Sequence, residues 1–281
     1  MGVALITLHG MGTTQPDYAN DLIHALKDQM TPQAFAGLSI QSVYYQKILQ
    51  DNEQRVWNNT DAQTKVHYDD LRKFLLFGFG DAGGLENRKE DDNSAYEQAQ
   101  VEIAKALLAA FEAKGADTDV VFISHSLGCQ VLSNYLWDAQ TWAAVQATGT
   151  GSLPDAGIWK TNDTTLPGLS AAQKKFLTGA TCMAWVTTGC NIPIFVAAHA
   201  VIEPIKRPRP EFVWKNFYDP DDVLGWPLRP LSAAYAALVE DVSMNAGRGF
   251  LNWALKSWNP LSHTAYWDDD DVVKPLAHLL S

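Results

Sequence analysis

Ser126 is the residue whose surroundings most strongly indicate chemistry. It lies between an apolar, β-branched run at residues 119–124, which predicts a buried strand, and a stretch at residues 127–137 with helical spacing. Ser124 and Gly128 stand two positions before and after it, and small side chains there let a strand and a helix approach closely. Such a turn would hold the hydroxyl above the sheet edge, with the helix N-terminus behind it. The alternative is a serine that only caps a helix.

This strand, turn and helix pattern resembles the G-x-S-x-G nucleophile elbow of the α/β-hydrolase superfamily, with Ser124 in place of the first glycine. The resemblance implies that Ser126 is the nucleophile of a serine hydrolase. A serine hydroxyl is a weak nucleophile, so it needs a base that takes its proton and donors that stabilise the oxyanion.

The donors are expected in a glycine loop that follows the first strand. Residues 3–8 form a short apolar run that ends in a His-Gly-Met-Gly segment, and this segment resembles the H-G-x oxyanion loop of the same superfamily. The resemblance implies an oxyanion hole made by the backbone amides of Met11 and Leu127. A tight turn that needs glycine, with a structural histidine, is the alternative. The residues of this segment are His9, Gly10, Met11 and Gly12.

An acidic segment at residues 216–231 should supply the third member of the site. It resembles the acid segment of DDHD-type intracellular phospholipases, in which an aromatic pair precedes D-P-V and a P-L pair follows. The resemblance implies that Asp222 is the acid, with Val-Leu in place of Pro-Val after it. Asp221 and Asp219 remain rivals, because a shift of the loop by one residue would exchange their roles.

The expected base lies near the C-terminus. Residues 261–267 resemble the S-H-x-x-Y-W sequence around the catalytic histidine of the same phospholipases, which implies that His263 is the general base. An imidazole with a pKa near 6.5 can accept the serine proton and return it to a leaving group. His125, next to the proposed nucleophile, is expected to point away from the site.

Three other patterns are interpreted as structural. The segment at residues 78–83 matches G-x-G-x-x-G formally, but a charged stretch follows it, which argues against a dinucleotide site. The four aspartates at residues 268–271 lack the spacing of a calcium loop and are typical of a helix N-terminus. Cys129 would lie inside the helix after the turn as a small packing residue. We expect no metal and no cofactor.

Apolar runs that alternate with helical stretches predict an α/β-hydrolase fold, with a mostly parallel central sheet flanked by helices. We expect one domain over residues 1–281, with a lid-like insertion at residues 138–180 that is rich in glycine and proline. Three aromatic residues of that insertion are expected to be exposed and to supply an apolar acyl pocket. They are Trp142, Trp159 and Phe176.

Composition restricts the partners. The chain has 281 residues, 21 Lys plus Arg against 32 Asp plus Glu, and a formal charge of −11, which would repel nucleic acid and anionic membrane surfaces. The three cysteines show no paired spacing, and no signal peptide or stretch of membrane-spanning length is recognised. We therefore expect a cytoplasmic protein with no nucleic-acid partner and no stable membrane insertion.

These observations together predict a serine hydrolase that cleaves carboxylic esters through an acyl-enzyme intermediate. Because acidic residues cluster on both sides of the expected acid and base, a neutral acyl ester or lipid is a better candidate substrate than a strongly anionic one. A thioesterase or acyltransferase with the same triad remains open, because the fold does not choose among these reactions. A noncatalytic binding module that kept the fold is the rival from another class.

Overall fold

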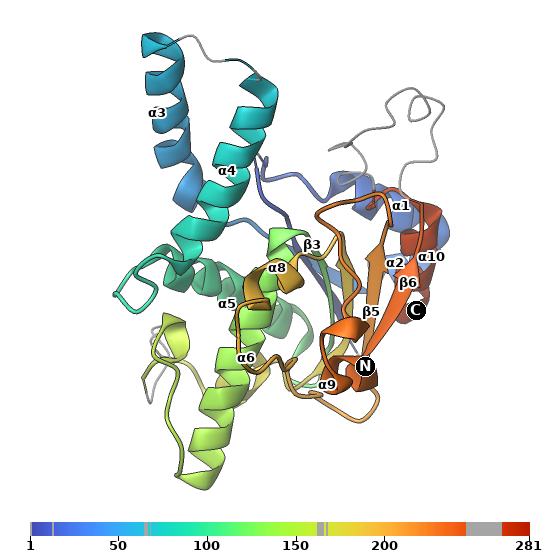
Figure 1. The fold of residues 1–281 in the computed structure, drawn as a ribbon. Helices are drawn as coiled ribbons and strands as arrows, with labels where there is room; N and C mark the ends of the chain where they lie inside the picture. Colours follow the sequence, from blue (N-terminus) through green and yellow to red (C-terminus); the bar gives the residue numbers. More distant parts are fainter. Residues whose placement is uncertain are drawn as a thin grey trace.

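The computed structural model describes residues 2–12, 14–64, 67, 69–161, 166, 168–245 and 266–281. Its described strands form one six-stranded sheet in the order β2-β1-β3-β4-β5-β6, and every neighbouring pair is parallel (Figure 1). The expected α/β architecture, a mostly parallel central sheet flanked by helices, is confirmed. The strands are β1 (Val3–Leu8), β2 (Leu38–Val43), β3 (Asp119–His125), β4 (Cys182–Thr188), β5 (Val213–Tyr218) and β6 (Val239–Ser243).

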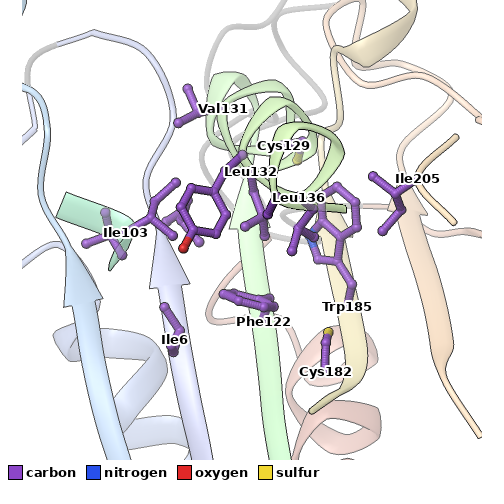
Figure 2. Close-up of a cluster of buried hydrophobic side chains, with 14 of the residues drawn as sticks. Ile6, Ile103, Phe122, Cys129, Val131, Leu132, Leu136, Cys182, Trp185 and Ile205 are labelled. Atoms are coloured by element: carbon purple, nitrogen blue, oxygen red, sulfur yellow. The ribbon is translucent and has the colours of Figure 1, made fainter. Parts of the chain in front are cut away.

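The sheet buries apolar side chains on both faces, which is why the central strands β1, β3 and β4 are nearly continuous hydrophobic runs rather than alternating ones. On one face, Ile6, Phe122 and Trp185 from three neighbouring strands belong to one buried cluster (Figure 2). On the other face, Leu5 and Val121 belong to a second buried cluster. The core thus lies in two layers, one on each side of the sheet.

Helices cover both layers. Helices α5 and α6 pack on the first face, and Figure 2 shows Leu132 and Leu136 of α6 above Phe122. Helices α1 and α10 contact each other and cover the second face through residues such as Leu26 and Leu276. The helices are α1 (Asn20–Gln29), α2 (Pro32–Ala36), α3 (Lys47–Gln63), α4 (Asp69–Glu86), α5 (Ala95–Lys114), α6 (Leu127–Thr148), α7 (Ala171–Leu177), α8 (Ile192–Val196), α9 (Ala233–Leu238) and α10 (Asp270–Leu279), with 3₁₀ turns η1 (Gly157–Trp159) and η2 (Arg229–Leu231).

Several helix ends follow from side-chain caps. The Ser94 hydroxyl accepts the Glu97 amide at the start of α5, and Gly115, with φ 91°, ends that helix. The Asp269 carboxylate accepts the Asp271 amide at the start of α10. The aspartate run at residues 268–271 is therefore a helix N-terminus, as expected.

The structure differs from expectation between β2 and α5. Residues 79–84, whose composition predicts a break between helical stretches, lie inside α4, which packs on α3 and projects with it from the body of the molecule (Figure 1). A Cβ at Gly78 would lie 2.6 Å from the Met11 sulfur, and a Cβ at Gly80 would lie 2.6 Å from a Glu53 carboxyl oxygen. These glycines thus allow close packing of α4, and the formal G-x-G-x-x-G match is a helical packing surface.

The expected insertion also differs. Helix α6 continues to Thr148, so the boundary placed at residue 138 falls inside it. The aromatic residues expected to be exposed there are buried: Trp142 is 8% exposed, Trp159 0% and Phe176 2%. All three belong to the buried cluster on the first face of the sheet. Trp159 packs against Trp142, and Phe176 packs against Phe111 of α5. These three side chains therefore cannot form an acyl pocket at the molecular surface.

Candidate functional site

Ser126 lies at the carboxyl edge of the sheet, between the end of β3 and the start of α6. Its backbone has φ 51° and ψ −122°, a conformation that costs free energy for any residue with a side chain. The Ser126 amide donates to the Thr188 carbonyl at 3.0 Å, which ties the turn to the end of β4. The sequence therefore adopts the sharp turn that the pattern predicted.

Small residues around this turn are required by direct backbone contact. A Cβ at Gly128 would overlap the His9 carbonyl oxygen, and a Cβ at Gly10 would lie 2.8 Å from the Ser126 Cβ. Ser124, which replaces the usual glycine, accepts a hydrogen bond from the Trp185 indole at 2.8 Å. Its hydroxyl is therefore satisfied inside the core and does not obstruct the turn.

Two backbone amides near this turn are available as donors. The Leu127 amide is the first of α6, where the helix dipole is positive, and the Met11 amide lies in the neighbouring glycine loop (residues 9–12). Within the described part of the chain, neither amide donates a hydrogen bond. Both expected oxyanion donors are thus unpaired among the described residues.

His9 holds the glycine loop from within an aromatic cluster. Its ring stacks on Tyr45 with centroids 4.1 Å apart, and the Tyr45 hydroxyl donates to the His9 carbonyl at 2.6 Å. Because Nε2 accepts the Tyr45 amide at 3.2 Å, Nδ1 carries the proton and donates to the Gly10 carbonyl at 2.8 Å. Burial lowers the pKa of His9 to about 4. His9 is therefore neutral, and its contacts hold the glycine loop in place.

The glycine loop is also tied to the α3–α4 hairpin. Gly12 has φ 87°, and its amide donates to Asp81 Oδ2 of α4 at 2.9 Å. Sequence reasoning missed this contact, since the two residues are 69 positions apart.

The three candidate acids differ in burial within the aspartate loop (residues 219–225) that follows β5. Asp222 is 5% exposed and Asp219 is 3% exposed, whereas Asp221 lies in the exposed class. Asp219 Oδ1 accepts the Asp221 amide at 2.8 Å, and Asp222 Oδ1 accepts the Leu224 amide at 3.0 Å. Burial therefore separates Asp222 from Asp221.

Tyr266 orients Asp222. Its hydroxyl donates to Asp222 Oδ2 at 2.9 Å and accepts the Asp219 amide at 2.9 Å. The neighbouring Trp267 indole donates to Thr188 Oγ1 at 3.0 Å, which joins this segment to the end of β4. The Tyr-Trp pair was noticed in the sequence as part of a motif, but its contact with the acid was not foreseen.

Two histidines of the sequence analysis have different outcomes. His263, the expected base, lies outside the described residues. The His125 ring nitrogen Nδ1 lies 3.1 Å from both the carbonyl and the hydroxyl oxygen of Thr188, and the ring packs near Tyr266 and Trp267. His125 is thus engaged with the end of β4, next to the turn that carries Ser126.

An apolar hollow opens beside the glycine loop, with a volume of about 460 Å³ that includes space open to solvent. Met11 and Leu224 lie in its wall, so it adjoins both the glycine loop and the aspartate loop. Helices α4 and α8 supply most of the remaining wall, and Phe79 of α4 is 62% exposed. The lining residues are Met11, Gly78, Phe79, Ala82, Asn191, Ile194, Phe195 and Leu224.

The segment expected to be a lid, residues 138–180, begins within α6 and continues beyond its C-terminal end. Helix α6 has 22 residues, and at about 1.5 Å per residue its C-terminal end lies about 33 Å along the axis from its start at Leu127. Figure 1 shows α6 extending away from the α3–α4 hairpin toward that end. The lid function of residues 138–180 stays a prediction.

No group of three or more metal-binding side chains occurs among the residues that the structure describes. Across the same residues, no helix combines the length and apolar character that crossing a membrane requires. All three cysteines are buried and free, and Cys129 packs inside α6, as expected.

No protein-family model and no curated protein matches the sequence. Among solved structures, a cutinase-like protein from Cryptococcus sp. is 10% identical, with 99% of this chain and 95% of that chain covered and a TM-score of 0.36. An iodinated complex of acetyl xylan esterase is 11% identical over 100% of both chains, with a TM-score of 0.41. A second acetylxylan esterase structure is 10% identical over 100% of this chain and 99% of that chain, with a TM-score of 0.40. At these values the similarity concerns only the coarse arrangement of sheet and helices.

Proposed function

We propose that this protein is a serine hydrolase that cleaves carboxylic esters, with Ser126 as nucleophile, His263 as general base and Asp222 as the acid that orients it. The observation that carries the proposal is the conformation of Ser126, a non-glycine residue at φ 51° between a parallel strand and a helix N-terminus. Such strain persists where the surrounding structure enforces it, and it is concentrated at functional sites. A serine that only capped a helix would not need this conformation.

In the proposed reaction, the Ser126 hydroxyl oxygen attacks the ester carbonyl carbon while His263 takes the hydroxyl proton. The carbonyl oxygen becomes an oxyanion, which the Met11 and Leu127 amides stabilise with hydrogen bonds. Collapse of this intermediate breaks the bond to the alcohol, which leaves with the proton from His263. Water then attacks the acyl-enzyme by the same route and releases the acid and the free serine.

The environment of Asp222 fits an acid that is held in a fixed orientation in a buried site. Its two oxygens accept hydrogen bonds from the Tyr266 hydroxyl and the Leu224 amide. Asp221 is exposed, so its orientation is not restrained by packing in the same way. The contacts therefore support Asp222 in preference to Asp221.

The hollow beside Met11 supports an ester with an apolar acyl group. Its wall is formed almost entirely by apolar atoms, and it begins next to a proposed oxyanion donor. A bound acyl chain would therefore extend from the reacting carbonyl between α4 and α8.

A fluorophosphonate probe tests the proposal directly, because it labels only an activated serine nucleophile. We expect labelling at Ser126 and its loss in S126A. Labelling should be retained in S232A, the control, because Ser232 caps the N-terminus of α9 with its side chain. The same variants should be assayed with p-nitrophenyl esters of increasing acyl length. Hydrolysis should be lost in S126A, together with labelling, and retained in S232A. A folded wild-type protein that is not labelled at Ser126 would show that the noncatalytic alternative is correct.

A further inference from the structure

Asp81 lies buried on α4 and joins three parts of the chain. It is 1% exposed, and its Oδ2 accepts the Gly12 amide at 2.9 Å. The side-chain nitrogen Nε2 of Gln46, the residue just before α3, lies 3.2 Å from both Asp81 oxygens. The contact with Gly12 is important because Gly12 follows Met11, whose amide is a proposed oxyanion donor.

A second carboxyl group lies against Asp81. Glu53 of α3 is 8% exposed, and its carboxyl group lies against α4 at Gly80, next to Asp81, with which it interacts electrostatically. The absence of a side chain at Gly80 lets Glu53 approach α4, because a Cβ there would lie 2.6 Å from Glu53 Oε1. Two buried carboxyl groups from adjacent helices therefore face each other.

Among the described residues, neither carboxyl forms an ion pair with Lys or Arg. Tyr45, which is buried, interacts electrostatically with Asp81. On α5, which packs on both helices, Tyr96 donates to Asp138 and Glu97 pairs with Lys160. Burial raises the pKa of both carboxyls, and their mutual repulsion raises that of Glu53 further.

A shared proton accounts for these contacts. With Glu53 protonated, its hydroxyl can donate to Asp81, while the Asp81 carboxylate accepts from Gly12 and Gln46. Without that proton, Glu53 would be a second buried anion with no hydrogen-bond donor, since both its oxygens are buried and unpartnered among the described residues.

We propose that Asp81 and Glu53 share one proton and act as positioning residues, which hold Gly12 and thereby aim the Met11 amide into the oxyanion hole. This inference rests on the proposed hydrolase function. As the pH rises, the shared proton is lost and two adjacent carboxylates repel each other. The α3–α4 contact then loosens, and kcat falls on the alkaline side.

Three variants test this role. D81L removes the acceptor for Gly12 and should lower kcat at about pH 7 by about tenfold or more, with little change in KM. D81N keeps an oxygen that can accept the Gly12 amide, and E53Q supplies a permanent N–H donor to Asp81. Both should keep the kcat ratio between about pH 9 and about pH 7 closer to one than in the wild type.

Asp138 offers a matched control in a second buried acid. Its Oδ2 accepts the Tyr96 hydroxyl at 2.7 Å and the Gln100 amide nitrogen at 2.8 Å, and it lies on α6 twelve positions after Ser126. D138L should destabilise the fold but should not lower kcat. Equal kcat in D81L and D138L would overturn the proposal, as would an alkaline fall that persists in both D81N and E53Q.

Hydrogen–deuterium exchange of the peptide that contains residues 10–12 separates this proposal from the hydrolase assignment. Faster exchange is expected in D81L, and in the wild type at alkaline pH beyond the intrinsic rate increase, whether or not the protein cleaves esters. Unchanged protection in D81L would overturn the positioning role. If D81L does not fold, D81N and E53Q still give the pH test.

A change in wild-type kcat on addition of MgCl2, CaCl2 or EDTA would overturn the shared proton in favour of a bound cation.

Discussion

The glycine loop and the aspartate loop both line the apolar hollow, but they are held in different ways. The aspartate loop is stabilised largely by its own backbone: the Asp222 amide donates to the Asp219 carbonyl at 3.0 Å, and the Gly225 amide donates to the Asp222 carbonyl at 3.1 Å. The Tyr266 hydroxyl adds two hydrogen bonds from outside, to Asp222 Oδ2 and from the Asp219 amide. Its geometry is therefore mostly a local property of the chain.

The glycine loop depends instead on residues that are distant in the sequence. The Tyr45 hydroxyl donates to the His9 carbonyl, and its ring stacks on that of His9. Asp81 accepts the Gly12 amide, and Gly128 of α6 packs closely against the His9 carbonyl. Positioning by distant helices allows a proposed oxyanion donor to respond to changes in the α3–α4 hairpin. We expect changes in the aspartate loop to act on turnover directly, and changes around the glycine loop to act through geometry.

The largest expected effect is that of Asp222→Asn, which tests whether the locally held loop carries the acid. An amide cannot stabilise the imidazolium formed on the general base and favours the wrong tautomer, so kcat should fall by about 10³- to 10⁴-fold. Steady-state hydrolysis of a soluble p-nitrophenyl ester measures this loss.

Asp221→Asn is the matched control, because the residue is adjacent but exposed. It should retain kcat within about twofold, as is usual for surface substitutions away from buried networks. The reverse result, with Asp221→Asn the inactive variant, would move the assignment of the acid by one residue.

Gly128→Ala tests the glycine loop from the side of α6. The added Cβ would overlap the His9 carbonyl oxygen, so the loop must shift by a fraction of an ångström or more. A displacement of about 1 Å at a catalytic group costs about 10²-fold in rate, and kcat should fall by this factor.

The control for this change is Gly83→Ala in α4, where a Cβ meets nothing within 4 Å. Replacing a helical glycine with alanine should stabilise the protein by about 0.5–1 kcal/mol in thermal or urea unfolding. If Gly128→Ala retained full kcat, the contact between α6 and the glycine loop would not position the oxyanion donor.

Tyr266→Phe removes a hydroxyl that supports the aspartate loop from outside with two hydrogen bonds. The Asp222 carboxylate loses one charge-assisted hydrogen bond and the Asp219 amide loses its acceptor, a difference of about 1.5 kcal/mol. This corresponds to about tenfold in kcat. An effect as large as that of Asp222→Asn would mean that the loop is not locally held.

The same distinction explains what could be predicted from the sequence. Strands β1 and β3 and the turn at Ser126 are defined by adjacent residues, so apolar runs and small-residue spacing predicted them closely. Asp222 was favoured over Asp221 only by resemblance, because burial of a carboxylate depends on the residues that pack over it. Tyr266 stood in a recognised motif, yet its partner is 44 positions away.

Predictions were wrong where packing overrides local composition. The segment with Gly78 and Gly80 is helical, and the absence of side chains at these glycines leaves room for Met11 and Glu53. No local pattern indicates these contacts. Trp159 was expected at the surface because its surroundings are rich in glycine and proline, but it lies in the core against Tyr135 and Trp142. Similarly, the link from Asp81 to Gly12 has no signature in the sequence near either residue.

The smallest expected effect is that of Gly78→Ala, which tests whether the hairpin shapes the acyl pocket. The new Cβ would lie 2.6 Å from the Met11 sulfur, and Met side chains move readily, so Met11 should shift into the hollow that it lines. One methyl group in an apolar pocket is worth about 1 kcal/mol, or about fivefold in kcat/KM. The loss should be confined to esters with long acyl chains, because a short chain would not reach the narrowed wall. A panel of p-nitrophenyl esters from acetate upward measures this dependence. An equal loss for all chain lengths would instead indicate that the Met11 amide has moved with its side chain.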